Sequence, residues 1–276
     1  MNCTAKEIRT FKKTVWNFYT SHGRDSLLWR KKAATPYHIL VSEIMLQQTQ
    51  VQRVIPKYKK FLQSFPTAKK LSEASTQEVL AHWVGLGYNR RAINLQKAAQ
   101  EIVTVHKNKF PKTHTELLSL PGIGPYTAGA ISAFAFNQPV PILETNIRTV
   151  FIYHFFRNKE HVSEKDLMEL AEKTLDKHNP KEWYWALMDY GSHLKSIHGN
   201  LSRKAKVFTK QSTFKGSIRE IRGAIIRMLS QKKSTAITIK AIQKETKRTT
   251  IDIKKALSGL EKDGLVIVKN NTYTLH

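Results

Sequence analysis

Two glutamates, Glu43 and Glu144, are the side chains whose setting in the sequence suggests chemistry. Glu43 lies in YHILVSEIMLQQ (37–48), a stretch that is apolar almost all round and therefore predicts a buried helix. A carboxylate in such a helix is costly unless it is paired, protonated or used in a reaction. From spacing alone, Glu43 is a functional acid or a core acid satisfied by a local partner. Glu144 opens another predicted helix, where it is a reactive carboxylate or a helix cap.

A glycine turn precedes Glu144 in the segment LPGIGPYTAGAISAFAFNQPVPILETNIRTV (120–150). Two glycines two residues apart, Gly122 and Gly124, cannot lie inside a helix, and they let the backbone turn sharply. The N–H groups of the turn then lie at the positive end of the helix that follows, which is a site suited to a phosphate. This segment is predicted to hold a nucleic-acid backbone and to point Glu144 at the bound molecule.

The composition points to a polyanionic partner. The chain has 276 residues, with 46 Lys and Arg against 21 Asp and Glu, a formal net charge of +25. An excess this large favours nucleic acid. No apolar run approaches the ~20 residues needed to cross a bilayer, and the first residues lack the apolar core of a signal peptide. The single cysteine, Cys3, excludes an intramolecular disulfide and a cysteine-ligated metal cluster within one chain. We therefore expect a cytoplasmic, nucleoid-associated protein without a membrane partner.

Helical periodicity dominates the first 210 residues. Apolar residues recur at helical spacing over 4–22, and further helices are expected near 50–65, 67–71, 75–83 and 90–107. No strand-like alternation interrupts them, so this region is predicted to be an all-α domain, 1–210. Tyr88 follows two glycines on a tight turn, where it either packs under the next helix or inserts beside an extruded base.

The pattern changes towards the C-terminus. Residues 203–216 are basic and aperiodic, which indicates a linker or a crossover that faces DNA. Three helices are expected next, and LVIVK-NN-TYTL then predicts a hairpin with its turn at Asn270 and Asn271. This order is typical of a winged-helix module, 217–276, that binds DNA or holds a partner. The three helices are predicted over 217–231, near 238–246 and over 249–262.

Four motifs resemble those of the helix-hairpin-helix DNA glycosylases, and most of all the MutY-type adenine glycosylases. They are SEIMLQQTQV (42–51), GLGYNRRA (85–92), LPGIGPYTAGAI (120–131) and ILETNIRTV (142–150), and the likeness runs from about residue 27 to about 191. LPGxG alone is moderately specific, because many DNA-binding proteins carry such hairpins, but its combination with SExMLQQT is strong. The resemblance implies an all-α, two-lobed helix-hairpin-helix glycosylase fold, here followed by the winged-helix module.

The resemblance also implies catalytic roles. Glu43 matches the general acid that protonates adenine N7, and an apolar helix is the environment that raises a carboxyl pKa towards neutrality. Glu144 matches the carboxylate that stabilises the sugar cation or adds to it, and Asn146 matches a polar residue that orients it. Tyr126 stands where bifunctional members such as endonuclease III carry a lysine. Because tyrosine cannot form a Schiff base, the enzyme should excise the base and leave the backbone intact.

The resemblance places a further set of residues on DNA. A glutamine-rich turn enters the duplex and fills the gap left by extrusion, although its residues could equally form a polar helix end. No metal ligand is expected, but the hairpin leaves room for a monovalent cation. Packing is another account of Trp29. The predicted DNA contacts are Gln47, Gln48, Thr49 and Tyr88 at the extruded site, Trp29 and Arg30 beside the base pocket, and Gly122, Ile123 and Gly124 at a phosphate.

Three features depart from the family pattern. The second carboxylate is usually aspartate, so Glu144 either sits back through a compensating shift or works through water. The region where most members bind an iron–sulfur cluster contains no cysteine, and His193 and His198 are too few to replace four thiolates. We therefore expect a clusterless member that needs no cofactor. The C-terminal domain that checks for 8-oxoguanine is replaced by the predicted winged helix.

The sequence thus predicts a monofunctional DNA glycosylase, acting as a monomer on double-stranded DNA with a mismatch or lesion. Its expected substrate is adenine opposite 8-oxoguanine or guanine. Two alternatives stay open: a glycosylase of the same fold for another damaged or deaminated base, and a lesion sensor without catalysis.

Overall fold

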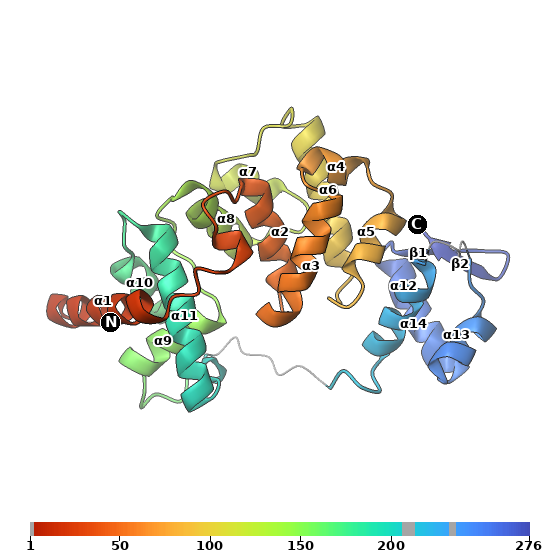
Figure 1. The fold of residues 1–276 in the computed structure, drawn as a ribbon. Helices are drawn as coiled ribbons and strands as arrows, with labels where there is room; N and C mark the ends of the chain where they lie inside the picture. Colours follow the sequence, from red (N-terminus) through yellow and green to blue (C-terminus); the bar gives the residue numbers. More distant parts are fainter. Residues whose placement is uncertain (1–2, 206–212, 232–235) are drawn as a thin grey trace. The chain divides into compact units, whose positions relative to one another are not determined.

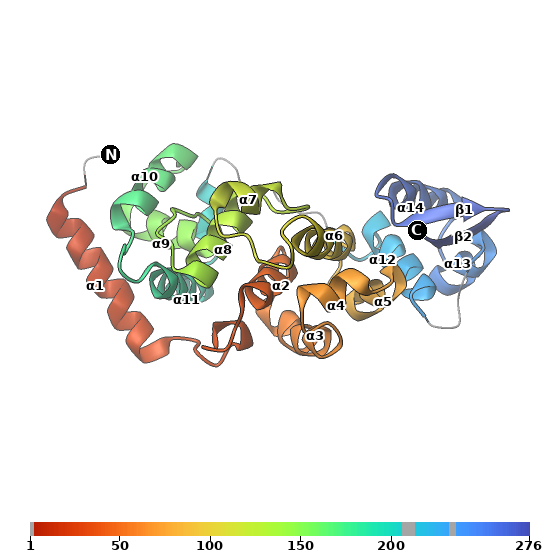
Figure 2. The same cartoon turned by 90° about the horizontal axis from the view of Figure 1, so that it is seen from above.

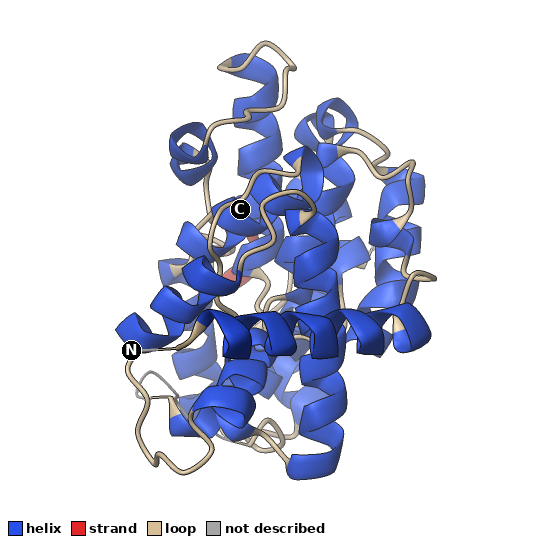
Figure 3. Ribbon diagram, turned by 90° about the vertical axis from the view of Figure 1, so that its left-hand side faces the viewer, coloured by secondary structure: helices blue, strands red, loops and turns tan. Residues whose placement is uncertain are grey.

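The computed structural model describes residues 3–205, 213–231 and 236–276, and these are mostly helical, with loops and a small sheet (Figures 1 and 3). The predicted all-α fold is therefore confirmed. In chain order the elements are α1 Ala5–His22, η1 Leu28–Arg30, α2 Pro36–Leu46, α3 Val51–Ser64, α4 Ala68–Glu73, α5 Thr76–Trp83, α6 Arg90–Thr104, α7 His114–Ser119, α8 Pro125–Phe136, α9 Thr145–Phe155, α10 Glu164–Thr174, α11 Pro180–His198, η2 Leu201–Lys204, α12 Ile218–Leu229, α13 Ile239–Thr246, α14 Thr250–Lys262, β1 Val266–Lys269 and β2 Thr272–Leu275.

The described residues form two compact units. The first comprises those within Met1–Glu43, Lys112–Ser119 and Ile123–Lys210, and the second those within Ile44–Pro111, Leu120–Gly122 and Gln211–His276. The chain passes from one unit to the other within α2 and again within the glycine turn. The domain boundaries 1–210 and 217–276 stay a prediction.

The core of the first unit is built on α9 and α11, which pack along each other, with α1 packed against α11. Aromatic rings fill the space between these helices. Phe11 of α1 meets Trp183 of α11 edge to face, with ring centres 6.0 Å apart, and also contacts Phe151 of α9 at 5.9 Å. Edge-to-face ring pairs have a preferred geometry in addition to the apolar area that they bury. These contacts therefore help to fix how α1, α9 and α11 pack on one another.

Helices α9 and α11 lie very close to each other at Gly191. A Cβ atom at this position would lie 2.7 Å from both the carbonyl carbon and the Cβ of Asn146, far inside van der Waals contact. The missing side chain therefore lets α11 touch the backbone at the start of α9. Glu144, the N-cap of α9, is two residues away, so this contact helps to place it.

In the second unit, α4 and α5 pack on α6, and α3 packs on α5. Ser75 and Glu78 form a capping box at the start of α5. Helix α6 ends at Thr104 rather than near 107, because Lys107 and Asn108 adopt left-handed backbone conformations that stop the helix. Helix α2, shared by the two units, likewise ends at Leu46 rather than at 48, and Gln48 has φ +52°.

The C-terminal elements have the predicted order of three helices and a hairpin (Figure 2). Val266 pairs with Leu275 and Lys269 with Thr272, and the turn residues Asn270 and Asn271 both have positive φ, as a two-residue hairpin turn requires. An antiparallel bridge between Ile237 and Tyr273 adds a third strand position to this sheet. Within the second unit, α12 packs against α5. Residues 206–212 of the expected linker lie outside the described residues.

Replacing Gly191 with alanine tests the packing of α9 on α11. The new methyl group overlaps the Asn146 backbone, so we expect the melting temperature to fall by the equivalent of about 1–3 kcal/mol, the usual cost of overpacking. Gly223→Ala in α12 is the matched control: it also removes a helical glycine but meets nothing within 4 Å, so it should stabilise by about 0.5–1 kcal/mol. Equal effects of the two changes on thermal unfolding would contradict the packing argument.

Candidate active site

The glycine turn between α7 and α8 has the form that its sequence predicts. Gly122 has φ +78°, and a Cβ there would lie 2.6 Å from the Cβ of Asn94, so both conformation and space demand glycine. Ile123 is buried and anchors the turn, while the flanking Gly122 and Gly124 are exposed. Gly124 caps α8, and Pro125 occupies its first turn. The turn therefore exposes backbone at the positive end of a helix.

Glu43 sits in the middle of α2 with 7% of its surface exposed, among fully apolar neighbours such as Leu40 and Val41. Its partner comes from α8, where the hydroxyl of Tyr126 donates a hydrogen bond to Oε2 of Glu43 at 3.4 Å. This distance is long for an O–H···O bond, so the stabilisation is weak. Glu43 is thus a buried acid that accepts a weak hydrogen bond from the first turn of α8.

Burial raises the pKa of Glu43 to about 7. The hydrogen bond from Tyr126 acts in the opposite direction, the negative charge of Glu144 raises the pKa further, and the positive charge of Arg30 lowers it. Burial also raises the pKa of the Tyr126 phenol well above its ordinary value, so the tyrosine stays a neutral donor. Glu43 consequently holds its proton at a pH where an ordinary glutamate has lost it.

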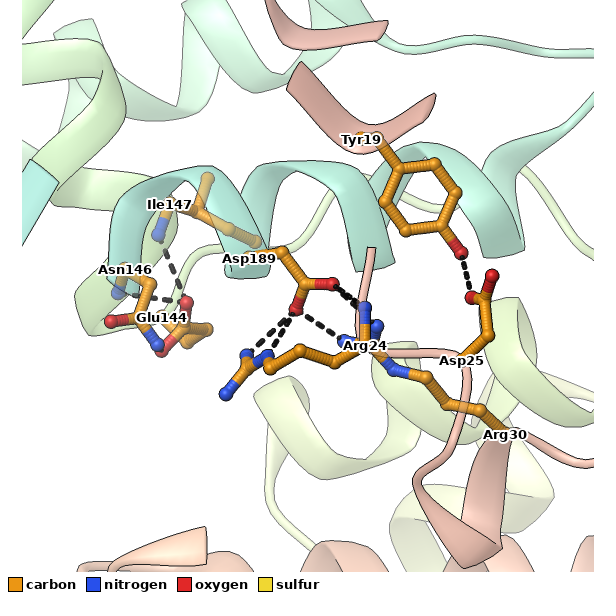
Figure 4. Close-up of polar contacts among 8 residues, drawn as sticks. All are labelled: Tyr19, Arg24, Asp25, Arg30, Glu144, Asn146, Ile147 and Asp189. Atoms are coloured by element: carbon orange, nitrogen blue, oxygen red, sulfur yellow. Dashed lines mark hydrogen bonds and ion pairs between the residues drawn. The ribbon is translucent and has the colours of Figure 1, made fainter. Parts of the chain in front are cut away.

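Glu144 is the N-cap of α9 (Figure 4). Its Oε1 accepts hydrogen bonds from the backbone N–H groups of Asn146 at 2.7 Å and of Ile147 at 2.9 Å, and the side-chain amide of Asn146 lies 3.3 Å from Oε2. Burial raises the pKa of Glu144, whereas these backbone donors and Arg148 lower it. The carboxylate therefore faces the positive end of a helix, which favours its ionised form more than the setting of Glu43 does.

The segment that leads to Glu144 is fastened on two sides. The hydroxyl of Tyr184 in α11 accepts from the N–H of Ile142 at 3.2 Å and donates to the carbonyl of Val140 at 2.8 Å. On the other side Ile142 packs onto α8 at Gly129, where a Cβ would lie only 2.5 Å from its Cγ2 atom. A glycine and a buried tyrosine thus hold the backbone that carries the second carboxylate.

Arg30 belongs to a buried ionic cluster. Its two terminal nitrogens form a bidentate pair with Asp189 of α11, at 2.7 and 2.8 Å, and its guanidinium lies 5.2 Å from the ring centre of Trp185. Arg24 adds a backbone N–H and its Nε to the same carboxylate, at 2.8 and 2.7 Å (Figure 4). Trp29 is buried beside Arg30. Asp189 was not predicted, because a single aspartate in WALMDYG gives no sign of its two arginine partners.

Burial alone would raise the pKa of Asp189, but the hydrogen bonds and charges of Arg30 and Arg24 outweigh it and hold the pKa below its usual range. Asp189 is therefore ionised. The Nε atom of Arg30 is buried and has no partner among the described residues. Because Arg30 lowers the pKa of Glu43, the cluster also acts electrostatically on the buried acid.

A single arginine of the second unit organises the residues expected to enter DNA. Nη1 of Arg91 donates to the carbonyl of Gln47 at 2.5 Å and to that of Ile44 at 2.8 Å, and Nη2 donates to Thr49 Oγ1 at 3.1 Å. The same Nη2 lies 3.1 Å from the carbonyl of Gly87. Arg91 thus caps the negative end of α2 and ties residues 47–49 to the turn 85–88. Within the run NRRA, nothing in the sequence distinguishes Arg91 from its neighbour Arg90.

The predicted site residues fall into two sets. The first unit holds the four predicted catalytic residues, and in it Glu43 contacts Tyr126 while Glu144 contacts Asn146. Tyr88 has φ +48° and is 40% exposed, and the guanidinium of Arg91 in α6 lies 5.5 Å from its ring centre, so both alternatives for this side chain stay predictions. The second unit holds Gln47, Gln48, Thr49, Tyr88 and Gly122, and the first holds Glu43, Tyr126, Glu144, Asn146, Trp29, Arg30, Ile123 and Gly124.

The C-terminal end of α11 is held by rings and backbone contacts. His193 packs on Phe18 with ring centres 4.9 Å apart, and His198 stacks on Tyr153 at 5.0 Å. The N–H of Val162 donates to the carbonyl of Lys204 at 3.0 Å. Within 3–205, 213–231 and 236–276 there is no group of three or more His, Cys, Asp and Glu residues arranged to hold a metal ion.

Residues 41–177 match the family described as HhH-GPD superfamily base excision DNA repair protein. The chain belongs to this family, as its helical fold and glycine turn indicate. A search of the described helices finds none with the length and apolar character needed to span a membrane.

Its similar relatives include adenine DNA glycosylases. That of Buchnera aphidicola subsp. Baizongia pistaciae is 40% identical over 186 residues, covering 66% of this chain and 52% of the relative. That of Rattus norvegicus is 34% identical over 197 residues, covering 67% and 38%. The chain thus spans about half the length, or less, of these relatives.

Solved structures show the same fold. A thermostable thymine-DNA glycosylase superposes with a TM-score of 0.62 at 26% identity, covering 69% of this chain and 88% of the other. A trapped endonuclease III–DNA covalent intermediate gives 0.60 at 18% identity, covering 70% and 88%. The second likeness concerns the fold alone.

The raised pKa of Glu43 makes protein stability depend on pH. Below pH 4.5 the carboxyl is protonated whether the chain is folded or not, and its favourable contribution is lost as the pH rises through about 7. The difference between 4.5 and about 7 corresponds to about 3 kcal/mol. Glu43→Gln should therefore gain melting temperature over the natural protein between pH 5 and pH 8. Glu172→Gln, at an exposed position of α10, serves as the control. A pH-independent difference for Glu43→Gln would contradict the buried acid.

Proposed function

We propose that the protein is a monofunctional DNA glycosylase that excises adenine mispaired with 8-oxoguanine or guanine from double-stranded DNA. The observation that carries the proposal is the buried Glu43, whose pKa is raised to about 7 and which feels the charge of a second carboxylate, Glu144, at a helix N-terminus. Two carboxyl groups with such different surroundings are what acid-assisted glycoside cleavage needs. The relatives named adenine DNA glycosylase specify the base.

In the proposed reaction, protonated Glu43 gives its proton to N7 of the extruded adenine. The bond between C1′ of the sugar and N9 of the base breaks with its electron pair leaving on the base, and positive charge develops on the sugar. Ionised Glu144 stabilises that charge. A water molecule adds to C1′ and releases a proton to a carboxylate, so the products are adenine and an abasic site. Proton donation by a positioned acid accounts for about 10²–10⁴-fold of the rate.

The glutamate at 144, where the family usually has aspartate, is compatible with this role. Its side chain folds back so that Oε1 caps α9 through the N–H groups of Asn146 and Ile147. The longer side chain of glutamate folds towards the start of α9 to form the cap. This supports a carboxylate that is drawn back from the sugar rather than one that reaches further towards it. Oε2, contacted by the Asn146 amide at 3.3 Å, is the oxygen left to face the sugar.

Tyr126 makes strand cleavage by the enzyme unexpected. It donates to Glu43 and has no amine with which to attack C1′. The proposed product is therefore an intact backbone with an abasic site.

The proposed grip on DNA uses both sets of predicted residues. The net charge of +25 supplies sequence-independent attraction, and the exposed backbone of Gly122 and Gly124 offers donors to a phosphate, with room for a monovalent cation. Gln48 and Tyr88, each at a positive φ, extend from the two turns tied together by Arg91 and would fill the space of the extruded base. Gln47 and Thr49 would contact the opposite strand, and Trp29 and Arg30 would border the base pocket. We propose that one chain suffices.

The chain does not fit an iron–sulfur cluster of the kind that most family members bind. Such a cluster needs four thiolates, whereas the only cysteine in the sequence is Cys3, and the region after α11 has none. His193 and His198 are engaged in ring contacts with Phe18 and Tyr153. We therefore propose that the enzyme works without this cofactor.

Duplexes with single defined lesions test the function. Each is incubated with the protein and then treated with alkali, which breaks the strand at abasic sites. Breaks at adenine opposite 8-oxoguanine or guanine are expected, with no breaks before alkali. Breaks only at other bases would indicate a glycosylase for another lesion, and binding without breaks on any duplex would indicate a sensor.

Glu43→Gln should abolish excision while binding persists. Unchanged turnover of this variant would remove Glu43 from the acid role.

The weak hydrogen bond to Glu43 predicts a shift in the pH dependence of excision. Because the Tyr126 hydroxyl lowers the pKa of Glu43, Tyr126→Phe should raise that pKa above about 7. An acid must be protonated to act, so the fall in single-turnover rate at alkaline pH should move to higher pH in the variant. Tyr58→Phe, which removes a buried hydroxyl from the second unit, is the control and should keep the wild-type profile. A shift of the alkaline limb of Tyr126→Phe to lower pH would contradict the assignment.

A further inference from the structure

The exposed ring of Tyr88 is held by two arginines from different parts of the second unit. The ring projects from the turn 85–88 with 40% of the residue exposed. The guanidinium of Arg91 in α6 lies 5.5 Å from its centre, and Nη1 of Arg219 in α12 donates a hydrogen bond to its hydroxyl at 3.2 Å. One contact fixes the face of the ring and the other its tip, so the C-terminal module takes part in orienting this side chain.

Arg219 is well placed for this task. It lies in the first turn of α12, and its Nη2 donates to the carbonyl of Thr213 at 3.3 Å, so two nitrogens of one planar guanidinium are engaged at the same time. Because the donor directions of a guanidinium are fixed in one plane, Arg219 can hold the Tyr88 hydroxyl in a defined place better than a lysine ammonium would. The loop before α12 and the turn 85–88 are thereby joined through a single side chain.

Further contacts hold α12 beside this turn. Asp263 accepts from Arg222 of α12 and also pairs with Arg90 of α6 at 3.6 Å. At the other end of the helix, the Gln77 side chain of α5 donates to the carbonyl of Leu229 at 3.3 Å. Helix α12 is thus tied to α5 and α6 along its length, and Arg219 is carried on an element with a defined position relative to Tyr88.

We propose that Arg219 is a positioning residue for Tyr88. Through this contact, the C-terminal winged-helix module helps to form the surface that meets the extruded base. This inference rests on the proposed function, in which Tyr88 fills the space of an extruded base. Extrusion costs a few kcal/mol, and a side chain that is already oriented loses less rotational freedom when it enters the stack. Holding the hydroxyl of Tyr88 before DNA binds lowers that entropic cost.

The alternative role for Arg219 is direct contact with a DNA phosphate, which any exposed arginine can make. The two roles differ in their dependence on the Tyr88 hydroxyl. A positioning residue acts only when the hydroxyl is present, whereas a phosphate contact acts without it. A double-mutant cycle over Arg219→Gln and Tyr88→Phe therefore separates them.

The cycle uses the full chain and a duplex with adenine opposite 8-oxoguanine, with 2-aminopurine next to the target adenine to report unstacking. We expect Arg219→Gln to lower the single-turnover excision rate and the fluorescence rise by about threefold to tenfold, the range of one hydrogen bond. In the Tyr88→Phe background the same change should have no further effect. Arg227→Gln removes the same charge from an exposed position of α12 and should match the natural protein. Equal melting temperatures show that the variants fold.

Two outcomes would overturn the proposal. An equal loss on Arg219→Gln in both backgrounds would make Arg219 a phosphate contact, and no loss in either would make the hydrogen bond to Tyr88 inconsequential. Absence of excision by the natural protein on every duplex is a different failure, since it would refute the proposed function. In that case the fluorescence cycle on the same duplexes still measures whether Arg219 acts through Tyr88.

Discussion

The site depends on two buried carboxyl groups, Glu43 and Glu144, that lie close enough for the charge of one to affect the pKa of the other. Like charges in such a place raise each other's proton affinity, and both cannot ionise cheaply. The fold resolves the conflict by giving the groups unequal surroundings. Glu43 has apolar neighbours and one weak phenol donor, whereas Glu144 has two backbone N–H donors at a helix start. Burial accordingly raises the pKa of Glu43 to about 7, whereas the N–H donors at the start of α9 oppose the rise that burial gives to the pKa of Glu144.

Such a division survives only if the backbone around Glu144 cannot relax. Three contacts oppose relaxation. The missing side chain at Gly191 brings α11 against Asn146, the Tyr184 hydroxyl hydrogen bonds to the backbone of Val140 and Ile142, and Gly129 leaves space for Ile142. A glycine at a helix crossing contributes little attraction itself, but it lets the neighbouring backbone or side chain come close. Interiors packed at crystal-like density resist displacement, so a cap residue placed in this way keeps its position when a substrate arrives.

Sequence reasoning predicted the elements and the kinds of residue well, and their partners poorly. The apolar run around Glu43 indicated burial, the Pro-Gly-x-Gly segment indicated a turn, and Asn270-Asn271 indicated a hairpin, because each of these follows from local chemistry. Asp189, Arg91 and Arg219 went unnoticed, since their importance comes from partners 40 to more than 150 positions away in the chain. Helix ends were also misplaced where residues such as Lys107 and Gln48 take left-handed conformations.

Capping and catalysis, which the sequence presents as alternative roles for Glu144, turn out to be compatible. A carboxylate that caps a helix is oriented by two N–H groups, and these donors oppose the rise in its pKa that burial causes, which suits a group proposed to face a developing cation. Asn146 contributes to both roles, because its N–H completes the cap while its side-chain amide touches the other oxygen. The backbone N–H of the cap could come from almost any residue, whereas the contact with Oε2 needs the side-chain amide of asparagine. What the cap does not require is a buried acid nearby, and it is the coexistence of the cap with Glu43 that distinguishes this helix start from an ordinary one.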